Sequence, residues 1–232
     1  EVFSGIFQLR TPTSSDSSSR RDGEKIGGTK FILGTELSCI YKKDGKVRRV
    51  HHVILAPSLA AVDRIIASLE TRGCNLRSDG RPILGVTSEA LLTMCLEADP
   101  RTLLIPAHAW TPWFAIFGSE SGFDSIEECF GDLSSHITTI ETGLSSDHAM
   151  NRRLSQLDRV ALTSSSDAHS LPNLGREATA FEIPELTFED ETLWRDPGSL
   201  ERPARDLAGG ERPRRERGEV QTRAREELPD ER

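Results

Sequence analysis

The sequence lacks several patterns that mark common classes of protein. It contains no run of about 20 apolar residues that could cross a membrane, and its first residues lack the basic start and apolar run of a secretory signal. It also lacks a GxxxxGK-S/T loop, because Val47 follows its one Gly-Lys pair, Gly45-Lys46. We therefore expect a soluble cytoplasmic protein that is not an ATP-driven helicase or motor.

Paired cysteines and an excess of positive charge are also missing. No CxxC pair occurs, so the spacing signals neither a zinc knuckle nor a redox dithiol, and we expect buried reduced thiols at Cys39, Cys74, Cys95 and Cys129. The formal net charge is -8, from 29 Lys and Arg against 37 Asp and Glu. This balance argues against a protein that coats nucleic acid, so any contact with DNA must be local.

Composition divides the chain into three zones. Residues 1–29 include a serine-rich run and are expected to form a loop left from an upstream region. Residues 30–185 alternate apolar segments of strand-like and helix-like period, which is typical of a folded domain. Residues 186–232 are crowded with Arg and Glu and have almost no apolar periodicity, so we expect a disordered charged tail.

The folded zone predicts strands and helices in alternation. Asp44-Gly45 is a hairpin signal between two apolar strands, of which the first contains Glu36 and the second contains His51 and His52. The predicted strands cover residues 31–41, 47–55, 102–106, 136–141 and 160–163. The predicted helices cover residues 59–72, with Ser58 as N-cap, a segment capped by Ser88 and ending near Asp99, and residues 124–130 and 147–157. This order predicts an α/β fold with a mostly parallel sheet, and a barrel is one way to close it.

Several residues with metal-binding chemistry lie at predicted strand ends. Asp167 and His169 follow the last strand, and a carboxylate and an imidazole at this spacing can turn toward one metal ion. His108 follows a buried strand. Glu36 lies in an otherwise apolar strand, where an ionised carboxylate is costly unless a positive group pairs with it, and His51 lies one hairpin turn away. Each residue alone is more often a satisfied core or solvated group, but together they favour a shared site.

Several long segments resemble the PHP domain of the endonuclease Q family of metal-dependent phosphoesterases. The segments include Pro106-Ala-His-Ala-Trp-Thr-Pro-Trp-Phe114, Phe117 to Phe130, Glu141-Thr-Gly-Leu-Ser-Ser-Asp147, Ser166-Asp-Ala-His-Ser170 and Leu174-Gly-Arg-Glu-Ala178. The resemblance extends over residues 30–183. It implies a (β/α)7 TIM-like barrel, incomplete here, with two or three divalent ions (Zn, Mn or Mg) at its mouth. It also implies hydrolysis of DNA beside deaminated bases, as a DNA-repair endonuclease.

The resemblance assigns individual positions. The family's metal ligands fall on Glu36, His51, His108, Asp167 and His169, and we expect Glu36, His108, Asp167 and His169 to be the catalytic positions. His52 is the alternative to His51, because adjacent histidines leave the register open by one. Glu141 is a candidate acceptor behind the ligands, with an ordinary solvated carboxylate as the alternative. The family's opening His-x-His motif and the histidine after it have no counterpart, so we expect a truncated domain that binds metal weakly and is inactive.

Contacts with DNA and two rival functions complete the hypothesis. Trp110, Trp113 and Phe114 offer faces that could stack on an unpaired base, although core packing explains them equally well. Arg77, Arg81 and Arg176 are candidate phosphate contacts or plain surface charges. The rival functions are a PHP phosphatase that acts on small phosphate esters and an inactive remnant.

Overall fold

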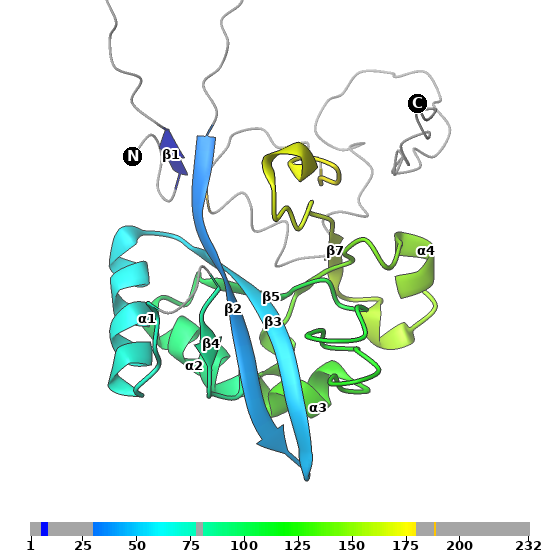
Figure 1. Cartoon of the computed structure of the whole chain (residues 1–232), viewed down its shortest axis with the longest axis horizontal. Coiled ribbons are helices and arrows are strands. Elements are labelled where there is room, and N and C mark those ends of the chain that lie inside the picture. Colours follow the sequence, from blue (N-terminus) through cyan, green and yellow to red (C-terminus); the bar gives the residue numbers. More distant parts are fainter. Residues whose placement is uncertain (1–5, 9–29, 78–80, 180–187, 189–232) are drawn as a thin grey trace, which may run out of the picture.

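The structure is a computed structural model that describes residues 6–8, 30–77, 81–179 and 188 (Figure 1). Its strands are β1 (Ile6–Gln8), β2 (Lys30–Lys43), β3 (Lys46–Ala56), β4 (Ile83–Leu84), β5 (Leu103–Pro106), β6 (Thr139–Glu141) and β7 (Ala161–Thr163). Its α-helices are α1 (Leu59–Thr71), α2 (Ser88–Ala98), α3 (Ile126–Phe130) and α4 (His148–Asn151), and short 3-10 helices cover Gly131–His136, Ser155–Leu157 and Leu171–Asn173. The tail predicted over residues 186–232 lies outside the described residues, apart from Phe188.

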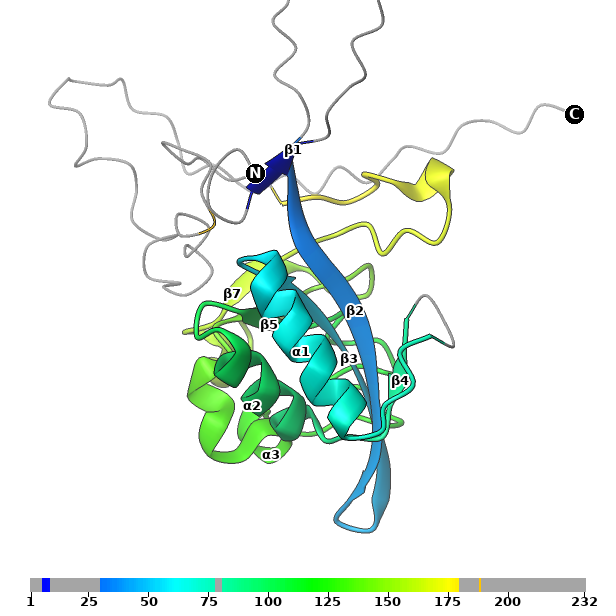
Figure 2. The ribbon, with the colours of Figure 1, turned by 90° about the vertical axis from the view of Figure 1, so that its left-hand side faces the viewer.

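The predicted hairpin is confirmed, and it is the longest feature of the fold. Asp44 and Gly45 have φ angles of 52° and 76°, so the two-residue turn matches the twist of the strands that it joins. The antiparallel register pairs Ser38 with His51 and Glu36 with Val53. Side chains alternate between the two faces of a strand, so Glu36 and His51 share one face of the ribbon. The opposite face turns toward α1 and α2 (Figure 2).

One hydrophobic core joins the hairpin to the helices. Ser58 caps α1 as predicted, since its side chain accepts a hydrogen bond from the backbone N–H of Ala61. The core then gathers apolar side chains from β2, β3, α1, α2 and α3, among them Leu37, Val50, Ile54, Ile65, Leu69, Leu91, Leu92 and Phe130. The four cysteines are free thiols, as expected, and three of them are buried. Burial raises the pKa of Cys95 to about 12, which keeps this thiol protonated and unreactive.

The prediction of a mostly parallel sheet is wrong. β3 runs antiparallel to both β2 and β5, and parallel pairing is confined to the short contacts β2–β4 and β6–β7. A parallel crossover contains one helix, whereas two helices and β4 separate β3 from β5. Within the described residues the strands form a five-stranded sheet and a two-stranded sheet, and these do not close into a barrel.

Several predicted boundaries also need correction. Thr87, not Ser88, is the N-cap of α2. The strand predicted over residues 136–141 begins at Thr139, because Gly131 takes a positive φ of 56° and leads into a 3-10 helix. The helix predicted over residues 147–157 is broken into α4 and a 3-10 turn. Residues 1–29 were expected to form only a loop, yet β1 pairs there with the start of β2. In the described part of the chain, no helix combines the length and apolarity that a membrane crossing requires.

Two leucines of α1 provide a test of this core. Leu69 is 2% exposed, whereas Leu59 is 60% exposed. Leu69→Ala should lower the free energy of unfolding by about 2–5 kcal/mol, because it removes buried apolar contacts and leaves a cavity. Leu59→Ala, the matched control on the same helix, should change it by less than about 0.5 kcal/mol. Chemical denaturation of both variants measures the difference, and equal losses would contradict the packing described here.

Candidate metal centre

Three ligand atoms from separate parts of the chain converge on one point. Oε1 of Glu36 lies 3.0 Å from Nδ1 of His51 and 3.8 Å from Nε2 of His108, and the two imidazole nitrogens lie 3.1 Å apart. Among the described residues, these three form the one group of His, Cys, Asp and Glu close enough to share a metal ion. Two of the three are buried, and Glu36 is half-buried. The sequence-based grouping of Glu36, His51 and His108 is therefore present in the fold.

The hairpin register and β5 create this convergence. Glu36 and His51 lie diagonally on the same face of the β2–β3 ribbon. β5 pairs with β3, and its continuation is fixed by a hydrogen bond of 3.0 Å from the N–H of Ala107 to the carbonyl of His51. His108 follows at once, so it arrives beside His51. The predicted position of His108 at the end of a buried strand is confirmed.

His108 is held in an unusual backbone conformation. Its φ is 31°, a region that few non-glycine residues adopt. The backbone N–H of His108 donates a hydrogen bond of 2.8 Å to Oε2 of Glu141, and Nδ1 of its ring lies 2.9 Å from the hydroxyl of Thr111. Glu141 is 5% exposed, so it is a buried acceptor that orients a candidate ligand, and not a solvated carboxylate.

Gly143 and Thr111 are contributors that sequence reasoning missed. Gly143 has a φ of 62°, and a Cβ atom built on it would lie 2.8 Å from Cβ of His108. This position therefore needs glycine for both its backbone angle and its close approach. The glycine directly after Glu141-Thr142 was a visible signal, but its meaning depends on His108 passing over it. The one signal that the sequence gives for Thr111 is its short distance from His108.

The electrostatics of the cluster favour an ionised Glu36 carboxylate beside imidazoles that are neutral or share a proton. Burial acts to raise the pKa of Glu36, but its interactions with His108, His51 and Arg81 outweigh this effect and hold the pKa well below its usual range. Burial lowers the pKa of His51, and its hydrogen bond with Glu36 only partly offsets this effect. Burial also acts to lower the pKa of His108, but Glu36, Asp167 and Glu141 together raise it. His51 is thus the imidazole better suited to offer a free lone pair at neutral pH.

The residues present fit a divalent metal ion. Ligands about 2.1 Å from one ion at tetrahedral angles lie about 3.4 Å apart, which is close to the separations of 3.0, 3.1 and 3.8 Å in the cluster. Ser38 lies directly opposite His51 on the same face, and its buried hydroxyl has no hydrogen-bond partner among the described residues. An unsatisfied buried hydroxyl on the face that carries the ligands is consistent with a group that completes the site.

The register excludes His52 as the ligand. His52 is fully buried on the opposite face of β3, where its Nε2 lies 2.8 Å from the hydroxyl of Ser88. The Ser88 hydroxyl also accepts a hydrogen bond from Tyr41, so His52 belongs to a polar contact inside the core. Of the two adjacent histidines that the sequence left open, His51 is therefore the one that faces Glu36.

Asp167 and His169 lie outside the three-residue cluster. Asp167 has a φ of 43°, and Nδ1 of His169 lies 3.0 Å from the carbonyl of Asp167. The side chain of His169 is 68% exposed. The negative charge of Asp167 still helps to raise the pKa of His108, after the larger effect of Glu36. Their role as metal ligands stays a prediction.

The candidate stacking residues divide into supporting and exposed rings. Trp110 donates a hydrogen bond of 2.8 Å to Asn151 and packs against Phe117, so it supports the fold around the site. Phe114 stacks on His51 at a ring-centre distance of 4.6 Å. Trp113 is 48% exposed, and the guanidinium of Arg49 lies 5.2 Å from the centre of its ring. Trp113 is thus the one of the three candidates whose ring is largely open to solvent.

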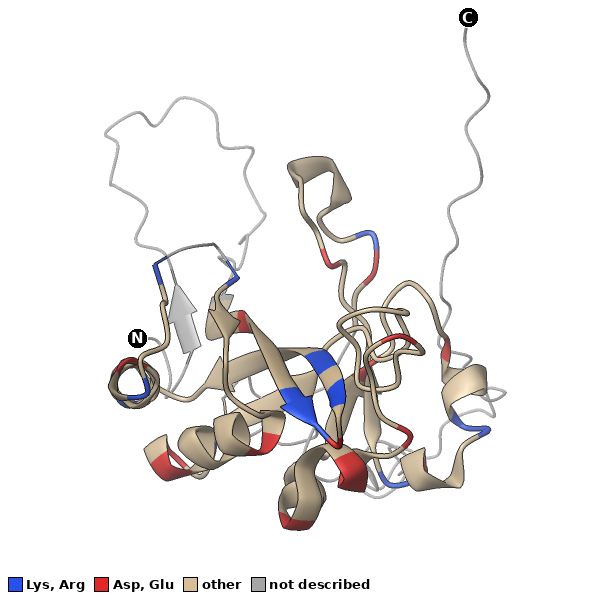
Figure 3. Cartoon of the chain, turned by 60° about the horizontal axis from the view of Figure 1, so that its bottom comes forward, with Lys and Arg blue, Asp and Glu red and all other residues tan. Residues whose placement is uncertain are grey.

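The candidate phosphate contacts also differ from one another. Arg81 donates a hydrogen bond of 2.9 Å to Oε1 of Glu36. Arg176 donates hydrogen bonds to the carbonyls of Ser166 and Asp167, so it braces the loop that carries Asp167. Arg77 is exposed. Figure 3 shows Lys and Arg scattered among Asp and Glu along the described chain, which agrees with the expectation that any contact with DNA is local.

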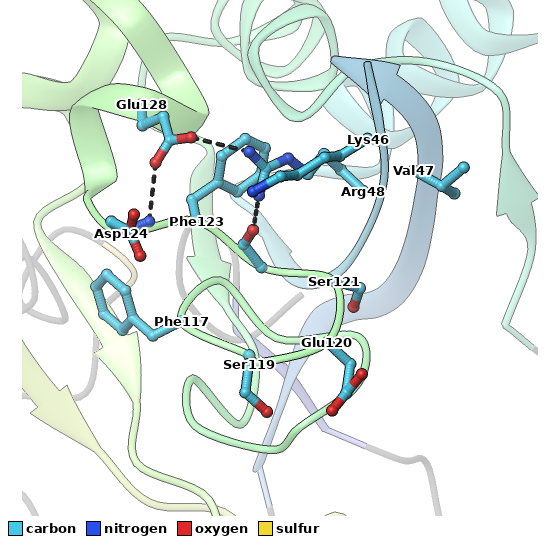
Figure 4. A pocket seen from close by; sticks show the side chains of 12 residues that line it. Lys46, Val47, Arg48, Phe117, Ser119, Glu120, Ser121, Phe123, Asp124 and Glu128 are labelled. Atoms are coloured by element: carbon cyan, nitrogen blue, oxygen red, sulfur yellow. Dashed lines mark hydrogen bonds and ion pairs between the residues drawn. The ribbon is translucent and has the colours of Figure 1, made fainter. Parts of the chain in front are cut away.

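A cavity of about 320 Å³ lies apart from these ligands, between the hairpin and the loop of residues 117–124 (Figure 4). Arg48 donates to Glu128 over 2.9 Å and to the carbonyl of Gly122, and its guanidinium covers the ring of Phe123. The wall of this cavity thus contains the guanidinium of Arg48, which is already paired with the carboxylate of Glu128. We assign these contacts to anchoring the loop on the hairpin.

Known proteins similar to this chain include one relative by sequence and two solved structures. No family model matches the sequence. The chain is 30% identical over 190 residues to the uncharacterized protein YqxK of Bacillus subtilis (strain 168), a match that covers 81% of this chain and 47% of that protein. It therefore spans about half the length of this relative.

Both solved structures are of endonuclease Q. The lesion-specific endonuclease PfuEndoQ from Pyrococcus furiosus matches with a TM-score of 0.60 and 34% identity, over 72% of this chain and 39% of that chain. Endonuclease Q in complex with a 27-mer duplex substrate that has an abasic lesion at the active site matches with a TM-score of 0.61 and 35% identity, over the same shares. The mixed α/β fold described here is thus similar to endonuclease Q in both sequence and structure.

Gly143→Ala should weaken metal binding, because the new methyl group would collide with His108. We expect the Kd for Zn²⁺ or Mn²⁺ to rise about 10-fold to 100-fold in isothermal titration calorimetry. Gly175→Ala is the matched control, since Gly175 also has a positive φ, 71°, but nothing lies within 4 Å of an added Cβ. The control should bind metal like the parent protein, and an equal loss in both variants would count against a specific role of Gly143.

The buried His52 makes stability depend on pH in a defined window. Burial and the nearby His51 lower its pKa from 6.5 to about 3. Because the folded pKa lies below the unfolded one, the contribution of His52 is fully present above pH 6.5 and is lost as the pH falls toward 3. The expected slope from this group is up to about 1.4 kcal/mol per pH unit, and His52→Leu should reduce the slope in urea denaturation. A variant that retained the full slope would refute this assignment.

Proposed function

We propose that this chain is an endonuclease Q-like phosphoesterase of the PHP type, which hydrolyses phosphodiester bonds in DNA with the help of divalent ions. The observation that carries the proposal is the convergence of Glu36, His51 and His108 in a chain that is 34% identical to a lesion-specific endonuclease. Carboxylate and imidazole ligands suit first-row divalent ions, which assist phosphodiester hydrolysis. Both the chemistry of the ligands and the similarity to endonuclease Q therefore support the proposed reaction.

Each residue of the cluster has a distinct part in the proposed reaction. Bound Zn, Mn or Mg ions, two or three in the complete family site, would polarise the phosphate and supply hydroxide near neutral pH. Glu36 contributes the anionic ligand, and His51 a nitrogen kept unprotonated by burial. Glu141 fixes the backbone of His108 and so aims its Nε2 at the other two ligands.

Asp167 and His169 are proposed as the further ligands, and with Glu36 and His108 as the catalytic positions. Their support is the resemblance and the effect of Asp167 on the pKa of His108. The loop that carries them is closed at its base, where the N–H of Ser164 donates a hydrogen bond of 2.7 Å to Thr179. Arg176 donates hydrogen bonds to the carbonyls of Ser166 and Asp167 within this loop. These contacts support the proposal that the loop is held in one place beside the cluster.

The proposed substrate is duplex DNA with a deaminated base. One endonuclease Q structure contains a duplex with an abasic lesion, and this is the support for a damaged duplex as the partner. Trp113 is the favoured stacking residue, because its ring is exposed and lies beside Arg49. Arg77 is an exposed candidate for a phosphate contact. Trp110 and Phe114 are assigned to supporting the site instead.

The proposed architecture is an incomplete (β/α)7 barrel within a domain over residues 30–185. Support comes from the junction of the two sheets beside the metal centre, where the N–H of Ala109 donates a hydrogen bond of 2.8 Å to the carbonyl of Glu141. This bond joins the chain after β5 to the end of β6. The ends of strands from both sheets therefore contribute to one site, as they do in barrel enzymes.

There are two alternative functions: a phosphatase would use the same metal ligands, whereas an inactive remnant would use none. A phosphatase for small phosphate esters would need the metal centre but not the exposed Trp113. An inactive remnant would retain the fold without turnover.

A nicking assay tests the proposed function. The protein, in excess over a labelled duplex with hypoxanthine, uracil or an abasic site, should nick the damaged strand slowly in the presence of Mn²⁺, Zn²⁺ or Mg²⁺. His108→Ala should reduce the rate at least about 100-fold because it removes a ligand, whereas Leu59→Ala, at an exposed position, should leave it unchanged.

Parallel measurements separate the alternatives. Phosphate release from small esters without nicking would favour the phosphatase. If calorimetry shows bound metal but neither substrate is cleaved, the endonuclease proposal is contradicted and the remnant remains.

A further inference from the structure

Arg81 is positioned next to Glu36 by the sheet itself. β4 pairs with β2 in parallel register, with Ser38 opposite Ile83, and the N–H of Ser38 donates a hydrogen bond of 3.0 Å to the carbonyl of Pro82. In a parallel pair, two steps back along both strands lead from Ser38 to Glu36 and from Ile83 to Arg81. The arginine is thus anchored beside the carboxylate by the backbone of the sheet edge.

Arg81 uses the same carboxylate oxygen as the histidines. Its Nη1 lies 2.9 Å from Oε1 of Glu36, and Nδ1 of His51 lies 3.0 Å from that oxygen. Arg81 is 35% exposed and Glu36 25% exposed, so the pair is only partly screened by solvent. A guanidinium remains charged at every accessible pH. The cluster therefore contains a permanent positive charge where a metal ligand would bind its ion.

We propose that Arg81 is a stand-in cation, which holds Glu36 among His51 and His108 when no metal ion is bound and competes with an entering ion for Oε1. Without a positive partner, a half-buried carboxylate would turn toward water, and the ligand set would be lost. The cost of this arrangement is reduced affinity, because an ion must displace the guanidinium or bind close to it. Arg81 thereby tunes how much free metal the site requires.

This inference rests on the proposed function only in that a divalent ion binds the Glu36 cluster. It goes further in giving Arg81 a role before any substrate arrives. An opposite role is also chemically reasonable, since an arginine that merely orients a ligand would increase metal affinity. The two roles predict changes of opposite sign, so measurement of metal affinity decides between them.

The test is calorimetric titration of the full chain with Zn²⁺ and with Mn²⁺. Arg81→Gln should lower the Kd at least 10-fold, since it removes the competing charge and keeps a polar side chain. Arg81→Lys, which keeps the charge, should bind like the parent protein. Arg77→Gln is the matched control: it removes the same charge from an exposed arginine four residues earlier and should leave the Kd unchanged.

Thermal unfolding gives a second readout that needs no activity. In EDTA, Arg81→Gln should unfold at a lower temperature than the parent, because Glu36 loses a partner, and saturating Zn²⁺ should raise its Tm by more than it raises that of the parent. A higher or unchanged Kd in Arg81→Gln would overturn the proposal, as would the absence of binding in both proteins. Failure of nicking with a lowered Kd would instead reject the proposed function and leave the role of Arg81 standing.

Discussion

The pairing of Ser38 with His51 is the constraint on which the candidate site depends. This register puts Glu36 and His51 on one face of the ribbon and sends His52 into the core on the other. A slip by one residue would exchange the faces of the two histidines and turn the buried Val50 and Ile54 out of the core. The positive φ angles at Asp44 and Gly45 and the apolar residues on the core face fix the register together. Metal-binding chemistry and folding are thus specified by the same hairpin.

Sequence patterns predicted the elements that have strong local signals. The hairpin followed from Asp44-Gly45 between apolar runs, and α1 followed from Ser58 and its apolar stripe. Strand direction did not follow: the sequence predicted two helices between β3 and β5, but it did not reveal β4, which lies between those helices and pairs with β2. The 3-10 helix after α3 and the break after α4 were missed, since they depend on the positive φ of Gly131 and on contacts made by Arg152 with carbonyls farther along the chain.

The ligands of the site could be predicted from the sequence, but the residues that position them could not. Glu36, His51 and His108 were grouped from a buried charge and a family resemblance, and the fold brings them together. The roles of Gly143 and Arg81 arise from segments that meet only in three dimensions, and the contact of Thr111 with His108 depends on the turn between them. Asp167 and His169 remain predictions, because their side chains lie on an exposed loop beyond the cluster.

Phe114 has a consequence for how the ring of His51 is held. Its backbone adopts a φ of 61°, and its ring lies almost flat on His51, with 28° between the planes. His108 approaches the same imidazole edge-on, at 77°. Phe114 covers one face of the His51 ring and His108 meets its edge, so this ring cannot flip as the ring of a surface histidine can. The aromatic cap therefore limits rotation of the His51 ring, whose Nδ1 lies 3.0 Å from Oε1 of Glu36.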